Sequence, residues 1–158
     1  MDWAGWALFG LFATGALSAV MISAQLVGLT RLDLPLLLGT IAIDDPDRAR
    51  VAGFFIHLAV GQGFAFGYAA SFALLGQATW WLGGILSLLH VAVALTVLVP
   101  LLAGVHPRIA SDRTGPSSTV ALEPPGRACL NYGARTPLVA IAAHVVFGVA
   151  LGVLLEVH

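Results

Sequence analysis

The stretch WWLGGILSLLHVAVALTVLVPLLAGV, residues 80–105, decides the fold because it contains no Asp, Glu, Lys or Arg. A bilayer core about 30 Å thick needs about 20 apolar helical residues, so this stretch is long enough to cross it. Three further stretches are as apolar, at about residues 3–29, 51–75 and 137–157. Spanning segments must satisfy their own backbone polar groups, which makes them helices. The sequence therefore predicts an all-α, polytopic four-transmembrane-helix bundle that forms one domain over residues 1–158.

The overall composition supports a membrane protein. Hydrophobic residues make up 59% of the chain and charged residues 9%, against about 45–50% and about 25% in soluble domains. A soluble globule with so little charge could not cover its surface, and a disordered chain would have fewer apolar residues. The net charge of −1 gives no reason to expect nucleic-acid binding. The lone cysteine, Cys129, cannot form an internal disulfide and is expected to be an exposed thiol.

The basic residues predict how the chain is threaded. All seven are arginines, and they fall only in the two connections at about residues 30–50 and 106–136: Arg31, Arg48, Arg50, Arg108, Arg113, Arg127 and Arg135. The positive-inside rule makes both connections cytoplasmic, so both termini are expected outside the cytoplasm. A basic set without lysine, in a chain rich in Ala, Gly and Leu, is typical of GC-rich bacteria. We therefore expect a multi-pass protein of the bacterial plasma membrane, which contacts the lipid bilayer and associates with a larger membrane complex or with its own copies.

Local signals mark the helix starts and the connections. Asp45 before Pro46, Thr136 before Pro137, and Thr79 are expected N-caps. The apolar run at residues 34–43 is expected either to continue the first helix or to lie in the membrane interface. Residues 104–136, rich in Pro, Gly and Ser, are typical of a flexible linker or a partner-contacting loop, and His106 in it is expected to be solvated.

The few polar residues of the spans recur at helical spacing, so in each span they share one helix face with Gly, Ala or larger apolar residues. The four sets are Thr14, Ser18, Met21 and Gln25; His57, Gly61, Phe64 and Tyr68; Gly83, Ser87, His90 and Ala94; and His144, Gly148, Leu151 and Leu155. Helix packing explains such faces without any ligand, because small residues allow close approach and polar ones hydrogen-bond across the bundle.

Depth suggests a site as well. Counted at about 1.5 Å per residue from the cytoplasmic arginines, Gln25, His57 and His144 should lie roughly 10 Å below that surface, with His90 nearer the midplane. Strongly polar groups at such depths are costly and are functional-site hypotheses by default. The sequence thus predicts an intramembrane Gln/His cluster.

Three chemistries suit this cluster. A b-type haem would take His57 and His144 as axial ligands, with Gly61 and Gly148 one turn away leaving room for the porphyrin. A metal ion such as copper would use the same two histidines and the thioether of Met21. A polar cavity would hold a small molecule.

The sequence contains no known catalytic motif, so we do not expect an enzyme. The expected function is a non-enzymatic accessory subunit, or a bundle that handles a small ligand or ion. The alternative is a haem b-binding electron-transfer subunit.

Overall fold

The structure is a computed structural model that describes residues 3–110 and 122–156. Its long helices are α1 (Trp3–Leu26), α3 (Pro46–Leu75), α4 (Trp80–Val93) and α6 (Thr136–Leu154), and its short elements are α2 (Leu34–Gly39), the π-helical turn η1 (Ala94–Leu98), α5 (Val99–Val105) and the 3-10 segment η2 (Arg127–Tyr132). Because α4, η1 and α5 are continuous, they form one span, so the described chain has four helices long and apolar enough to cross a membrane. The predicted all-helical chain with four such helices is confirmed.

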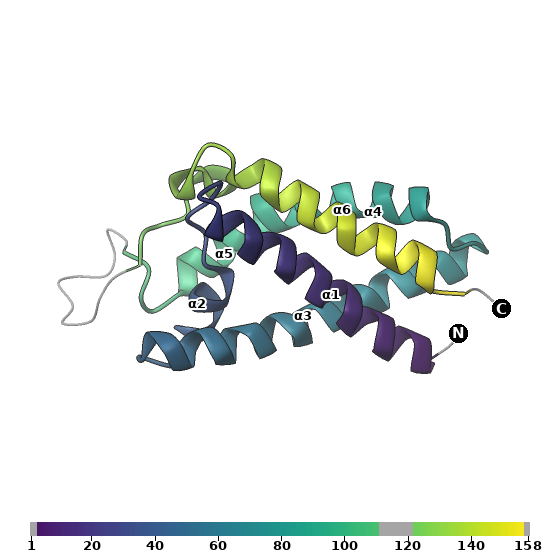
Figure 1. The fold of residues 1–158 in the computed structure, drawn as a ribbon, viewed down its shortest axis with the longest axis horizontal. Coiled ribbons are helices and arrows are strands. Elements are labelled where there is room, and N and C mark those ends of the chain that lie inside the picture. The colour runs from purple at the N-terminus through teal and green to yellow at the C-terminus, as the bar shows by residue number, and fades with distance from the viewer. Residues whose placement is uncertain (1–2, 111–121, 157–158) are drawn as a thin grey trace.

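The threading brings the two ends of the chain together. The start of α1 and the end of α6 lie at one end of the bundle, opposite the end that carries α2 (Figure 1). This arrangement agrees with an even number of crossings. Which side of the membrane each end faces stays a prediction.

Two of the three predicted helix caps are confirmed. The Asp45 side chain accepts from the Arg48 amide at 2.9 Å, and the Thr79 hydroxyl accepts from the Leu82 amide at 3.4 Å. The cap at Thr136 is wrong, because α6 already begins there. Its hydroxyl is buried and lies 2.7 Å from the hydroxyl of Thr30, so it joins the start of α6 to the connection after α1.

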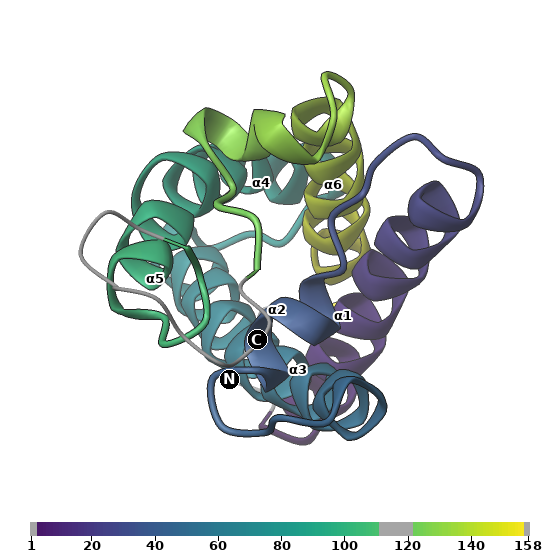
Figure 2. The same cartoon turned by 90° about the vertical axis from the view of Figure 1, so that its left-hand side faces the viewer.

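The helices are arranged in the spatial order α3, α1, α6, α4. α1 packs between α3 and α6, and α6 packs between α1 and α4. Although α3 and α4 follow each other in the chain, each packs mainly on another helix, and viewed from the end the elements form a ring (Figure 2). Residues from all four spans consequently line one cavity.

Glycines set the closest helix contacts. A Cβ atom added at Gly148 would lie 2.2 Å from the Gly83 carbonyl oxygen, and one added at Gly152 would lie 2.2 Å from the Thr79 carbonyl oxygen. These glycines bring the backbones of α4 and α6 into contact, as is common for small residues between membrane helices.

The connection after α1 does not continue that helix. The backbone turns at Gly28, whose φ is +76°, and α2 then folds back against α3. Gly53 permits this contact, because a Cβ atom there would lie 1.8 Å from the Pro35 carbonyl oxygen. The expected continuation of the first helix is wrong. The alternative, a segment that lies in the membrane interface, stays a prediction.

Part of the predicted linker is folded. Residues 111–121, which include Arg113, lie outside the described residues. The remainder packs on the bundle: the Tyr132 hydroxyl donates to the Glu123 carbonyl at 2.6 Å, and Arg31 pairs with the Glu123 carboxylate at 2.9 Å. A flexible linker is therefore wrong for residues 122–135.

Candidate functional site

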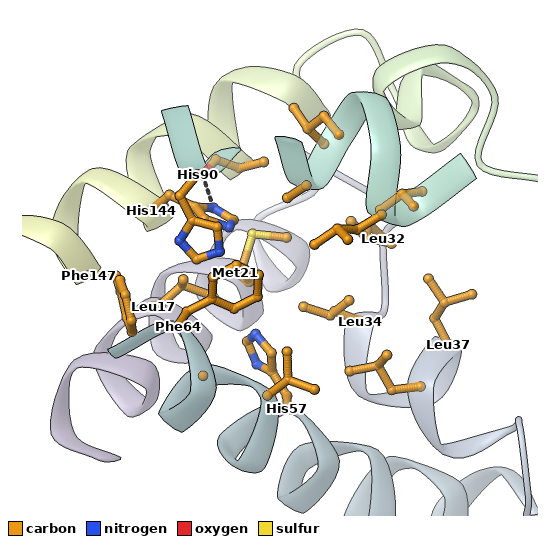
Figure 3. Close-up of a pocket in the computed structure, with 18 of the residues that line it drawn as sticks. Leu17, Met21, Leu32, Leu34, Leu37, His57, Phe64, His90, His144 and Phe147 are labelled. Atoms are coloured by element: carbon orange, nitrogen blue, oxygen red, sulfur yellow. Dashed lines mark hydrogen bonds between the residues drawn. The ribbon is translucent and has the colours of Figure 1, made fainter. Parts of the chain in front are cut away.

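A cavity of about 150 Å³ lies inside the half of the bundle that carries α2 (Figure 3). Every span contributes to its wall, which is mainly aliphatic: Leu17, Met21, Leu32, Leu34, Leu37, Leu38, Val60, Leu95, Leu98, Val99 and Leu102. Its hydrogen-bonding side chains are few: Thr14, His57, His90, Cys129 and His144. An apolar pocket with a small number of placed polar groups is typical of a small-molecule site.

His57 enters the cavity from α3 and is oriented by α1. Its Nδ1 atom lies 3.1 Å from the Ser18 hydroxyl oxygen, which itself donates to the Thr14 carbonyl at 2.8 Å. Since that carbonyl only accepts, the Ser18 proton is used there, and the Ser18 oxygen accepts from the Nδ1–H of His57. The lone pair of His57 is then on Nε2.

His144 also has its Nδ1 atom engaged in a hydrogen bond, in this case within its own helix. Its Nδ1 atom lies 2.8 Å from the Ala140 carbonyl oxygen, one turn earlier in α6. A carbonyl accepts only, so Nδ1 carries the proton and Nε2 carries the lone pair.

His90 joins the two from α4 and is held by aromatic contacts. Its ring stacks on Phe64 with centroids 3.9 Å apart and meets the edge of His144 at 4.7 Å. Its Nδ1 atom is 3.5 Å from the Tyr68 hydroxyl, and Phe147 closes the far side at 5.7 Å. The polar end of the cavity is therefore also its aromatic end.

The consequence is a pair of hydrogen-bond acceptors facing an apolar space. Within residues 3–110 and 122–156, no side chain or amide donates to Nε2 of His57 or His144. Both atoms keep some accessible surface, because Oε1 of Gln62 is the one fully buried side-chain N or O atom without a partner in the part of the chain that the structure describes. A ring nitrogen that faces apolar walls in place of water still loses hydrogen-bond energy. These two atoms therefore favour an occupant that brings a donor or a Lewis acid.

The cavity contains most, though not all, of the predicted site residues. His57, His90, His144, Met21 and Gly61 line it. Gln25 does not, because it lies in a separate groove with Asp33, Arg50 and Phe54 among its lining residues. The structure thus separates Gln25 from the histidines, and the cluster consists of histidines alone.

The glycines next to the two histidines do not provide room for a porphyrin. The space above Gly148 is taken by the Gly83 backbone, and a Cβ atom at Gly61 would lie 2.2 Å from the Thr14 hydroxyl. The Phe64 ring is drawn between His57 and the His90–His144 pair (Figure 3). An apolar cavity of about 150 Å³ holds a molecule of benzene size, and haem is several times larger. The two imidazoles suit coordination, but the space does not fit haem in this arrangement.

A metal ion gains no support from the ligand set. Among the described residues, no three or more His, Cys, Asp or Glu side chains are grouped so that they could share a metal ion. The copper site with Met21 stays a prediction.

At the α2 end of the cavity, contacts that the sequence analysis missed hold α2 against the end of α5. His106, expected to be solvated, is only 4% exposed. Its Nε2–H donates to the Leu37 carbonyl at 2.9 Å, and its Nδ1 accepts from the Arg108 amide at 3.1 Å. The Arg108 guanidinium donates in turn to the Thr40 carbonyl at 2.9 Å. We call these contacts the His106 latch, and they fix α2 to the end of α5.

Cys129 was also misjudged from its position in a long connection. The side chain is fully buried and lines the cavity, and burial raises the pKa of its thiol to about 11. Its φ of +62° is rare for a residue with a side chain. The expected exposed thiol is wrong because the side chain is buried. No pattern in the sequence indicated the turn that buries it.

A π-helical turn shapes the wall opposite His57. In η1 the backbone widens over residues 94–98, and the turn ends two residues before Pro100, which has no amide hydrogen to donate. Ala94, Leu95 and Leu98 of this turn line the cavity. Such turns are frequent at functional sites, and Pro100 inside the apolar run was the available signal.

Comparison with known proteins identifies no family for the chain. No protein-family model, no curated protein and no solved structure matches the chain.

Proposed function

We propose that this multi-pass membrane protein binds a small, largely apolar molecule that donates a hydrogen bond, with its donor placed at His57 and His144. The observation that carries this proposal is that two cavity-lining histidines have Nδ1 engaged, by Ser18 and by the Ala140 carbonyl, while the other walls are almost wholly apolar. This arrangement leaves the Nε2 lone pairs of His57 and His144 for a ligand. Two side chains with the same free acceptor, from two different helices, offer two alternative partners for one donor.

Size and shape narrow the ligand. A cavity of about 150 Å³ suits a single six-membered ring, and the stacked Phe64 and His90 rings favour an aromatic one. An aromatic hydroxyl compound, a phenol, satisfies both requirements. Its hydroxyl would donate to an imidazole Nε2, while its ring would replace empty space beside the leucines.

The proposal is tested with two probes of nearly the same shape, 4-methylphenol and p-xylene. Protein labelled with ¹⁵N-histidine in lipid nanodiscs is titrated with each, and the imidazole ¹⁵N signals are assigned with single-histidine variants. We expect 4-methylphenol to shift the Nε2 signal of His57 or His144 and p-xylene to shift neither. His57→Phe and His144→Phe should each weaken 4-methylphenol binding, together by roughly tenfold, which is the range of one hydrogen bond.

Two controls keep the result specific. Ser71 is a partly exposed residue of α3 that does not line the cavity, and its hydroxyl donates to the Gly67 carbonyl of its own helix, so Ser71→Ala should leave binding unchanged. Ala94→Leu fills the cavity and should abolish the binding of both probes. Equal responses to 4-methylphenol and p-xylene would overturn the proposal. So would a preparation with a Soret band that disappears in His57→Ala and His144→Ala, which would establish the haem b alternative.

We further propose that the protein lies in a bacterial plasma membrane with both ends outside the cytoplasm, as an accessory subunit of a larger assembly. The support is the placement of the two arginine-bearing connections at the end of the bundle opposite the start of α1. Reporters active only outside the cytoplasm, fused to each end, should both be active. Reporters that disagree with each other would contradict the threading. Purification in mild detergent should recover the protein with stoichiometric partners.

A further inference from the structure

The structure points to the route by which the ligand enters. Of the residues that line the cavity, only Val60 and Leu98 are exposed at the surface, with 46% and 39% of their area accessible. Val60 is on α3 and Leu98 is on η1, so the cavity opens between these two elements. This is also where consecutive spans do not pack along each other. We call this opening the Val60–Leu98 portal.

The portal faces the hydrocarbon of the bilayer. Val60 is the fifteenth residue of the 30-residue helix α3, about 21 Å along the helix from either end. At that depth the surface of a spanning helix contacts acyl chains. Toward the other end, α2 lines the cavity with Leu34, Leu37 and Leu38, none of which is exposed, and the His106 latch holds this helix in place.

From this geometry we infer that the ligand is a resident of the membrane: a phenol-type head group on a long apolar tail, with its ring in the cavity and its tail leaving through the Val60–Leu98 portal. The inference rests on the proposed function for the head group and adds the tail and the lateral route. The cavity has room for the ring only, so a tail of more than a few carbons has to lie in lipid. A tail that stays in lipid loses no apolar contact on binding.

The test compares a tailed and a tail-less ligand at equal mole fraction in the membrane. The ¹⁵N-histidine titration in nanodiscs is repeated with 4-dodecylphenol beside 4-methylphenol. We expect both to shift the same imidazole signal, with affinities that agree within about threefold. Narrowing the portal with Val60→Trp or Leu98→Trp should lower the affinity for 4-dodecylphenol by at least about tenfold, the range expected for overpacking. The same variants should lower the affinity for 4-methylphenol far less.

A matched control isolates the portal. Val97 neighbours Leu98 in η1, is 45% exposed and does not line the cavity, so Val97→Trp adds the same bulk to the same surface. It should change the affinity for neither ligand. Having two portal variants protects the test if one of them fails to fold.

Each outcome decides between the two proposals. If 4-methylphenol binds but 4-dodecylphenol does not, the lateral route is wrong and the proposed function stands. The route is equally wrong if Val97→Trp weakens 4-dodecylphenol as much as Val60→Trp does. If neither phenol binds, the proposed function fails, and this inference fails with it.

Discussion

The two ends of the bundle pack in different ways. Toward the end where α1 begins, backbones meet at glycines, and even one added Cβ atom at Gly148 or Gly152 would overlap a neighbouring carbonyl. Toward the opposite end, glycines bring α2 onto α3, but leucines, the π-helical turn and α2 keep the four spans apart around a cavity. The difference shows that one set of spans can serve two purposes: the glycine end fixes the bundle, and the leucine end leaves room for a ligand.

The largest expected effect comes from the glycine end. Gly148→Ala places a Cβ atom 2.2 Å from the Gly83 carbonyl oxygen, so α4 and α6 must separate along their contact. Overpacking of this kind costs about 1–3 kcal/mol of unfolding free energy, and a backbone obstacle belongs at the upper end. The measurement is the unfolding midpoint in a detergent titration.

Gly63 provides the matched control for that change. A Cβ atom there meets nothing within 4 Å, so Gly63→Ala should leave stability unchanged or raise it by a few tenths of a kcal/mol. Equal effects at the two glycines would show that the backbone contact between α4 and α6 does not cause the loss of stability.

An intermediate effect is expected at the leucine end, in the His106 latch. His106→Ala removes the donor to the Leu37 carbonyl and the acceptor for the Arg108 amide. The loss of two buried hydrogen bonds costs about 1–3 kcal/mol, but it should fall mainly on the attachment of α2. Amide exchange at Leu37 and Thr40 should accelerate by tenfold or more, while exchange in α6 stays unchanged.

The neighbouring residue supplies the reference for the latch. Val105 is exposed and makes no latch contact, so Val105→Ala should leave the α2 amides protected. If His106→Ala accelerates exchange across all four spans equally, the latch is part of the global fold and α2 is not a separately released element.

The sequence predicts the spans of the bundle but not the shape of its cavity. Spans and their starts follow from local properties, since long apolar runs must be helices in lipid and Asp45 before Pro46 is a cap. The cavity depends on the rotation of each helix about its axis and on the distances between helices, which local sequence does not determine. Gln25 lies one turn from Met21 on the same predicted face, yet faces another groove, because α1 and α3 diverge toward that end (Figure 1).

The burial of residues in the connections could not be predicted from a sequence pattern either. His106 and Cys129 lie in segments whose composition is typical of solvated loops, and both are buried by contacts with residues far along the chain. The three cavity histidines were recognisable because a costly residue inside a span requires an explanation. Their hydrogen-bond directions required the positions of Ser18 and Ala140.

The smallest effect concerns Cys129 and appears only in alkali. Because burial raises the pKa of its thiol from 9.0 to about 11, the folded chain holds this proton more tightly than the unfolded one. Folding stability is therefore unaffected below about pH 9 and falls as the pH rises from there toward 11. At pH 8 the thiolate fraction should be roughly 100-fold lower in the folded chain, so alkylation by iodoacetamide should be at least that much slower than in unfolding detergent. Comparable rates in the two states would show that the thiol is exposed.

The account depends most on two lone pairs, and these are directly observable. The ¹⁵N spectrum of ligand-free protein at neutral pH reports, for each histidine, which ring nitrogen carries a proton. We predict that His57 and His144 are both neutral with the proton on Nδ1, so that each Nε2 is a free acceptor. A proton on Nε2 of either residue, or on both nitrogens, would contradict the proposed site, because the cavity would then present a donor where the ligand is expected to bring one.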